Sequence, residues 1–109
     1  MELITQYQQW LERVQQHTRL LLFVKTNNCS VCEGLYPQIE ALEPDANIPF
    51  FIANAAEIPE LAGQLSVFTA PVVILMKNGT EYARFARFVP IQEVKWKIQE
   101  LKKWEESYD

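Results

Sequence analysis

The spacing of apolar residues predicts a helix at each end of the chain and a short one between them. Residues 2 to 17 place apolar side chains at helical spacing, with glutamine, glutamate and arginine between them, which is typical of an amphipathic helix. These apolar residues are Leu3, Tyr7, Trp10, Leu11 and Val14. A short helix over residues 57–65 accommodates Pro59 in its first turn. A last helix begins after Pro90 and carries its apolar stripe on Ile91, Val94, Ile98 and Leu101. We expect Trp10, Trp96 and Trp104 to be packing residues.

Three apolar runs predict strands covered on both faces by other elements. They span residues 20–24, 50–53 and 72–76, and they are continuous rather than alternating. Asn78-Gly79 follows the third run and is the strongest short signal for a hairpin, so residues 81–88 are expected to return antiparallel. That last strand mixes polar and apolar side chains, as expected at the edge of a sheet.

A further helix is predicted after Asn28. Leu35, Ile39 and Leu42 recur at three- and four-residue steps, and residues 43–45 end the helix. Pro37 lies inside it and is expected to kink it, because proline removes one backbone hydrogen bond. The element order is then α-β-α-β-α-β-β-α. This order predicts an α/β protein with a central mixed sheet and helices on both faces. A length of 109 residues predicts a single domain over residues 1–109.

Composition and charge narrow the classes of partner. The net charge is −4, and the lysines of the last helix are interspersed with glutamates, so neither a nucleic acid nor an anionic membrane is an expected partner. Glu2 stands where a secretory signal would carry basic residues, and no apolar run approaches the length of a membrane span. We therefore expect a cytoplasmic protein, in a compartment that keeps thiols reduced. Two lone cysteines there favour a reactive role.

Those two cysteines, Cys29 and Cys32, lie between a buried strand and the start of a helix. In a βαβ layout this spacing is typical of a thiol–disulfide exchange site, and sites in such sheets lie at the carboxyl ends of the parallel strands. Cys29 faces the free N–H groups and the positive dipole of the helix, which favour its thiolate. Cys32 lies almost one turn later, so its sulfur can stay near that of Cys29 while being less exposed. We expect Cys29 to be the nucleophile and Cys32 the resolving thiol.

Several motifs together resemble the thioredoxin family over nearly the whole chain. They are Cys29-Ser30-Val31-Cys32, Pro37, Ala70-Pro71 before a buried strand, and Lys77-Asn78-Gly79 at the hairpin. The resemblance implies a thioredoxin-like fold and an oxidoreductase that needs no cofactor or metal. It also implies disulfide-containing protein substrates, and a thioredoxin reductase or another dithiol donor as partner.

The resemblance further implies a cis peptide bond before Pro71, with this proline against the cysteine pair. The backbone of Ala70 would pair with an extended stretch of substrate. The implied substrate-binding residues are Asn28, Ser30, Val31, Ala70 and Pro71.

The chain also departs from the family pattern at the site. Asn28 replaces a tryptophan, and Ser30-Val31 replaces Gly-Pro. The buried acid that relays protons to the second cysteine falls on Phe23, and its lysine partner falls on Ile52. We expect slower deprotonation of Cys32 unless water, Glu33 or Lys25 takes over.

Two other functions stay open at this stage. The first is a thioredoxin-fold module for binding or redox sensing, with little turnover, which the missing tryptophan and relay favour. The second is zinc binding, for which two cysteines supply half of a four-ligand site. His17, the only histidine, is remote in sequence, so a dimer sharing one ion would have to complete the ligands.

Overall fold

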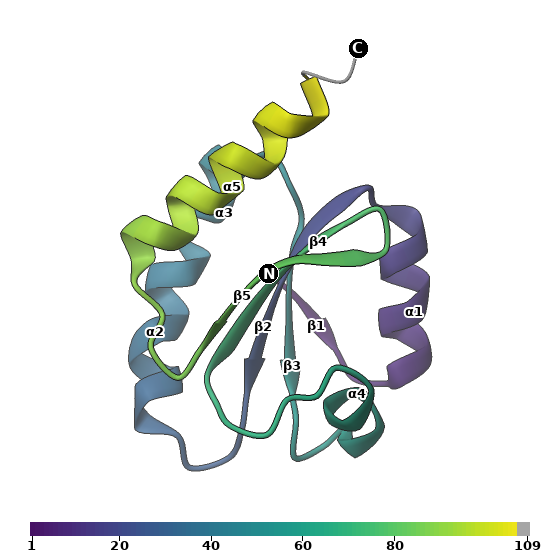
Figure 1. The fold of residues 1–109 in the computed structure, drawn as a ribbon. Helices are drawn as coiled ribbons and strands as arrows, with labels where there is room; N and C mark the ends of the chain where they lie inside the picture. The colour runs from purple at the N-terminus through teal and green to yellow at the C-terminus, as the bar shows by residue number, and fades with distance from the viewer. Residues whose placement is uncertain (107–109) are drawn as a thin grey trace.

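The protein is built on one five-stranded mixed sheet with the strand order β1-β3-β2-β4-β5 (Figure 1). The computed structural model describes the backbone of residues 1–106 and the side chains of residues 1–103. The strands are β1 (Glu2–Ile4), β2 (Arg19–Lys25), β3 (Phe50–Asn54), β4 (Val72–Lys77) and β5 (Thr80–Ala86). Strands β1 and β2 pair parallel with β3, β4 pairs antiparallel with β2, and β5 pairs antiparallel with β4.

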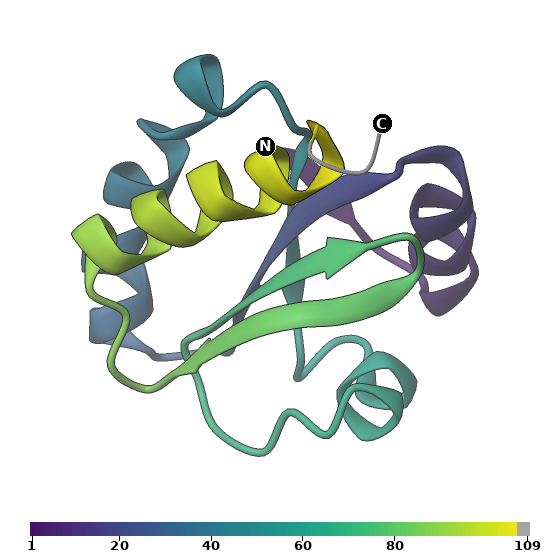
Figure 2. The same ribbon diagram turned by 45° about the horizontal axis from the view of Figure 1, so that its top comes forward.

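Helices cover both faces of this sheet, which confirms the predicted α/β class. They are α1 (Tyr7–Gln16), α2 (Ser30–Glu40), α3 (Glu43–Ala46), α4 (Pro59–Gln64) and α5 (Ile91–Glu106). Helices α2, α3 and α5 lie on one face, and α1 and α4 lie on the other (Figures 1 and 2). None of the helices within residues 1–106 is long and apolar enough to cross a membrane.

The side chains of β2 point alternately to the two faces of the sheet and so belong to two separate core clusters. Leu21 and Phe23 point to the face of α2 and α5, whereas Leu20, Leu22 and Val24 point to the face of α1 and α4. All five side chains are completely buried. The continuous apolar run is therefore a strand covered on both faces, as predicted.

The amino-terminal segment corrects the prediction of one helix over residues 2–17. Residues 2–4 form β1, the helix begins at Tyr7, and Leu3 is 57% exposed rather than part of the apolar helix face. Ile4 is the one buried residue of β1. Parallel pairing with β3 satisfies backbone groups at the edge of the sheet, and this long-range contact overrides the local helical spacing.

Two other boundaries and one tryptophan also differ from prediction. Residues 43–46 form the separate helix α3, and the β5 strand ends at Ala86, two residues before Phe88. Trp10 is buried as expected, but Trp96 is 59% exposed. Trp96 follows the buried Val94 by two positions, which places it on the opposite side of α5. The side chain of Trp104 lies outside the described residues.

Candidate functional site

The two cysteines lie at the start of α2 and are joined by a disulfide, with their Cα atoms 5.2 Å apart. Cys29 is the N-cap residue, and its Sγ accepts a hydrogen bond of 3.2 Å from the backbone N–H of Cys32. Cys29 is half-buried, whereas Cys32 is 2% exposed. The two sulfurs are thus within bonding distance but unequally accessible, as the sequence predicts.

The turn before Cys29 explains an asparagine at position 28. Asn28 has a φ of 54°, in the left-handed region that asparagine tolerates better than most residues. The amide of Asn54, at the end of β3, donates a hydrogen bond of 2.8 Å to Oδ1 of Asn27. This bond ties the turn to the sheet and so fixes the approach to Cys29. The side chain of Asn28 itself is exposed, like those of Ser30 and Val31.

The second predicted part of the site is the segment before β4. The Ala70–Pro71 peptide bond is cis, which confirms what the resemblance implies. Pro71 is buried and Ala70 half-buried, and Ala70 and Cys29 both pack against the core cluster that contains Cys32. Val24, near the end of β2, pairs with Val72 at the start of β4, so the cysteines that follow β2 and the Ala70–Pro71 segment lie at the same end of the sheet.

Arg84 on β5 holds the loop that leads to this proline. Its guanidinium donates hydrogen bonds of 2.6 Å to the Leu65 carbonyl and 3.1 Å to the Ser66 carbonyl, just beyond the end of α4. The carboxylate of Glu81 accepts two further bonds, of 2.7 and 3.1 Å, from the same guanidinium. The contacts with Leu65 and Ser66 join residues 18 and 19 positions apart, and the sequence pattern does not indicate them.

A hollow beside Cys32 lies where the resemblance places the proton relay. Phe23 and Ile52 line it and are direct neighbours across the β2–β3 pairing. Lys25, Glu33 and Tyr36 complete its walls, and its volume is about 220 Å³. Phe23 is completely buried and Ile52 is 8% exposed. The sheet surface under Cys32 is therefore apolar, and the ionisable groups of this hollow come from Lys25, Glu33 and Tyr36.

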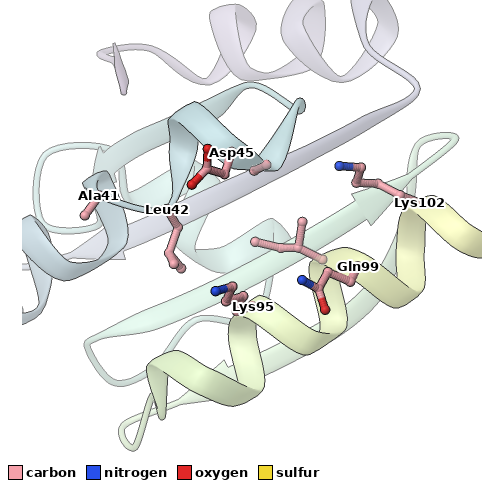
Figure 3. Close-up of a pocket in the computed structure, with 8 residues that line it drawn as sticks. Ala41, Leu42, Asp45, Lys95, Gln99 and Lys102 are labelled. Carbon is pink, nitrogen blue, oxygen red and sulfur yellow. The ribbon is translucent and has the colours of Figure 1, made fainter.

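A second hollow, of about 200 Å³, lies between α3 and α5 (Figure 3). Leu42 and Ile98 line it together with Asp45, Lys95 and Lys102. It adjoins Ala41, at the carboxyl end of α2, whereas the cysteines lie at the amino end. The length of α2, about 15 Å, separates the two places, so this hollow is not part of the disulfide site.

His17 lies at the opposite end of β2 from the cysteines. It is the C-cap residue of α1, and its ring lies 5.8 Å from that of Phe51. The seven residues of β2 span about 20 Å, so His17 cannot complete a metal site with the cysteines of its own chain. Residues 1–103 contain no group of three or more histidine, cysteine, aspartate or glutamate side chains placed to hold a metal ion.

Comparison with known proteins agrees with this geometry. The family model for thioredoxin matches residues 2–100. The chain belongs to the thioredoxin family. A curated relative of this thioredoxin-family chain is the thioredoxin-like protein YdfQ of Bacillus subtilis (strain 168). It is 35% identical over 89 residues, which cover 81% of this chain and 80% of the relative.

Solved thioredoxins share the fold at low sequence identity. Reduced Schistosoma mansoni thioredoxin superposes with a TM-score of 0.85 at 19% identity, covering 93% of this chain and 99% of the other. Fasciola hepatica thioredoxin gives a TM-score of 0.84 at 18% identity, and the match covers 92% of this chain and 98% of the other. A thioredoxin-family fold that carries a cysteine pair at the start of α2 is typical of thiol–disulfide oxidoreductases.

Proposed function

We propose that the protein is a thiol–disulfide oxidoreductase that acts on disulfides of protein substrates, with Cys29 as nucleophile and Cys32 as resolving thiol. The observation that carries this proposal is the unequal exposure of two sulfurs held together at the start of α2. Attack on a large disulfide needs an accessible thiolate, and resolution needs a second thiol that reaches the first one but competes poorly for substrate.

The proposed reaction has two exchange steps. The Cys29 thiolate attacks one sulfur of the substrate disulfide, and the other substrate sulfur leaves as a thiolate that takes up a proton. Cys32 then loses its proton and attacks Sγ of Cys29, which forms the Cys29–Cys32 disulfide and releases the second substrate sulfur. A dithiol donor, a thioredoxin reductase or another, reduces the pair again. Substrate is oxidant in this cycle and the donor is reductant, so two electrons pass from donor to substrate.

The amino end of α2 supports the first step. Helix N–H groups and the dipole stabilise negative charge on Cys29, and the Cys32 N–H already contacts that sulfur in the disulfide. Asn28, Ser30 and Val31 border the nucleophile, and Ala70 offers backbone groups beside Pro71 to an extended substrate segment. The cytoplasm, which keeps thiols reduced, is the compartment that we propose for this cycle.

The second step is where this chain differs from the family pattern. Cys32 is buried against Phe23 and Ile52, and an apolar environment disfavours a thiolate. In our proposal its proton passes to water in the hollow or to the carboxylate of Glu33, and the positive charge of Lys25 stabilises the thiolate that remains.

Single serine variants test the proposal with insulin as the disulfide substrate and dithiothreitol as the donor. Cys29→Ser should abolish reduction above the dithiothreitol background, because no nucleophile remains. Cys32→Ser, reduced beforehand and then freed of dithiothreitol, should accumulate a mixed disulfide with insulin, visible on a non-reducing gel and lost on adding excess thiol. If both variants retained the wild-type rate, the proposed function would be wrong.

The apolar surface under Cys32 favours a second candidate, a module for binding or redox sensing with little turnover. It predicts that a protein partner binds the double variant Cys29→Ser/Cys32→Ser as tightly as it binds the wild-type chain. The oxidoreductase predicts the opposite: stable capture requires Cys29 and is strongest in Cys32→Ser.

A further inference from the structure

Several segments at the disulfide end of the sheet carry exposed apolar side chains. Six large apolar residues are exposed among the described side chains, and three of them belong to segments at this edge of the sheet. Phe68 is 85% exposed in the loop before the cis proline, Phe88 is 79% exposed just after β5, and Val31 is 61% exposed in the first turn of α2. Figures 1 and 2 both show these three segments converging at the carboxyl end of β2.

A positively charged residue, Arg87, immediately precedes Phe88 and is held by its backbone beside the cis proline. Its backbone N–H donates a hydrogen bond of 2.8 Å to the carbonyl of Pro71. The N–H of Phe88 donates to the carbonyl of Ala86, also at 2.8 Å, which closes a tight turn around Arg87 with a φ of 67°. A positive φ is uncommon for a residue with a long side chain, and such conformations cluster at functional sites. The turn thus holds Arg87 directly beside the cis proline.

The guanidinium of Arg87 is free to contact a partner. The residue is exposed, and within residues 1–103 no side chain forms an ion pair or hydrogen bond with its guanidinium. Arg84, three residues earlier, contrasts with it, because its guanidinium is bound to Glu81 and two carbonyls. Lys25 and Glu33, which line the hollow beside Cys32, carry opposite charges that offset each other. Arg87 therefore adds an unpaired positive charge beside the cis proline, in a chain whose net charge is −4.

We infer that Arg87, together with the exposed Phe68 and Phe88 of neighbouring segments, selects substrates in which an acidic residue follows the disulfide within an apolar, extended stretch. A guanidinium binds a carboxylate through paired hydrogen bonds, and exposed aromatic rings bury apolar side chains on either side of it. This inference rests on the proposed function, because it specifies which disulfides the site accepts.

The test compares three disulfide-linked peptides that differ at one position. The peptides share an apolar sequence and carry Glu, Gln or Lys two residues after one cysteine, and kcat/KM is measured with dithiothreitol as donor. The wild-type chain should reduce the Glu peptide about three- to tenfold faster than the Lys peptide, with the Gln peptide between them, as expected for one exposed charge pair and its reversal. In about 1 M NaCl, where the screening length falls to about 3 Å, the ratio should approach one.

Charge variants assign the selectivity to one residue. Arg87→Gln should remove the difference between the Glu and Lys peptides, and Arg87→Glu should reverse their order. Arg19→Gln is the matched control, since Arg19 begins β2 at the opposite end of the sheet, and it should keep the wild-type ratio. Phe68→Ser and Phe88→Ser should raise KM for all three peptides alike. Their rings are exposed, so folding should be preserved.

The possible failures are distinguishable. Equal rates for the three peptides with wild-type protein, or an unchanged ratio in Arg87→Gln, would overturn the selectivity and leave the proposed function intact. If no peptide were reduced and Cys32→Ser trapped none of them, both the proposed function and this inference would be wrong.

Discussion

Replacing Arg84 with glutamine should destabilise the fold by removing the support of the loop between α4 and β4. The guanidinium satisfies the carbonyls of Leu65 and Ser66, which have left the hydrogen-bond ladder of α4, and it is paired with Glu81. Each charged hydrogen bond of this kind contributes about 1 kcal/mol where water has partial access, and the ion pair adds up to about 1 kcal/mol. We expect Arg84→Gln to lower the free energy of unfolding by about 2 kcal/mol.

Urea unfolding followed by far-ultraviolet circular dichroism measures this loss. For a chain of this size the midpoint should fall by about 1 M urea, with an unchanged slope. Glu81→Gln should cost about half as much, because the two carbonyl contacts remain. Arg87→Gln is the matched control: its guanidinium has no partner among residues 1–103, so its effect should stay within about 0.5 kcal/mol. If Arg84→Gln and Arg87→Gln unfolded at the same urea concentration, water would satisfy the Leu65 and Ser66 carbonyls as well as the guanidinium does. The expected loss of about 2 kcal/mol would then be wrong.

Three further predictions test other parts of the structure. Asn28→Gly should unfold at the wild-type urea concentration, whereas Asn28→Val should lose about 1–2 kcal/mol, because a branched side chain opposes the φ of 54°. Partial burial, together with the hydrogen bond to Glu100, raises the pKa of Tyr82 to about 12, so a titration at 295 nm should show a late step that Tyr82→Phe lacks. Since the unfolded chain ionises at the ordinary pKa near 10, Tyr82 stabilises the fold below pH 10 and this contribution should disappear between pH 10 and 12. Leu101→Ala, at a completely buried position of α5, should cost about 2–5 kcal/mol in urea unfolding, whereas Trp96→Ala, at an exposed position, should cost far less.

The local spacing of apolar residues was enough to predict the strands and helices that contribute most of the buried core residues. Runs such as residues 20–24 and 72–76 are apolar throughout because helices cover both faces, and Asn78-Gly79 adopts positive φ at both residues, as a tight hairpin requires. The β1 strand escaped prediction because three residues are too few to show alternation. Its single buried side chain, Ile4, is equally compatible with the helical spacing that continues at Tyr7.

The cysteine pair was predictable for the same local reason, but its surroundings were not. Cys29 and Cys32 are close because they are one helical turn apart. Arg87 lies beside Pro71 only because Val72 pairs with Ala86 across two antiparallel strands, and that register is set by contacts along the whole sheet. Exposure of Phe68 and Phe88 is likewise a tertiary property, since an aromatic residue in a sequence is as compatible with a core as with a surface.

In the proposed reaction the two cysteines depend on different parts of the fold, and this bears on the choice between the two candidate functions. Cys29 depends on the amino end of α2, where its sulfur already accepts a hydrogen bond from the helix backbone. The proposed attack of the Cys29 thiolate on a substrate disulfide should therefore have the full support of the helix N–H groups. Cys32 depends on the sheet beneath it, where the Phe23–Ile52 pair offers packing but no proton acceptor. A chain that forms a mixed disulfide readily but resolves it slowly stays bound to its substrate for longer. The same apolar pair that completes the core would therefore lengthen capture relative to turnover. Because this capture requires Cys29, the double variant Cys29→Ser/Cys32→Ser distinguishes it from binding by a module that does not use the cysteines.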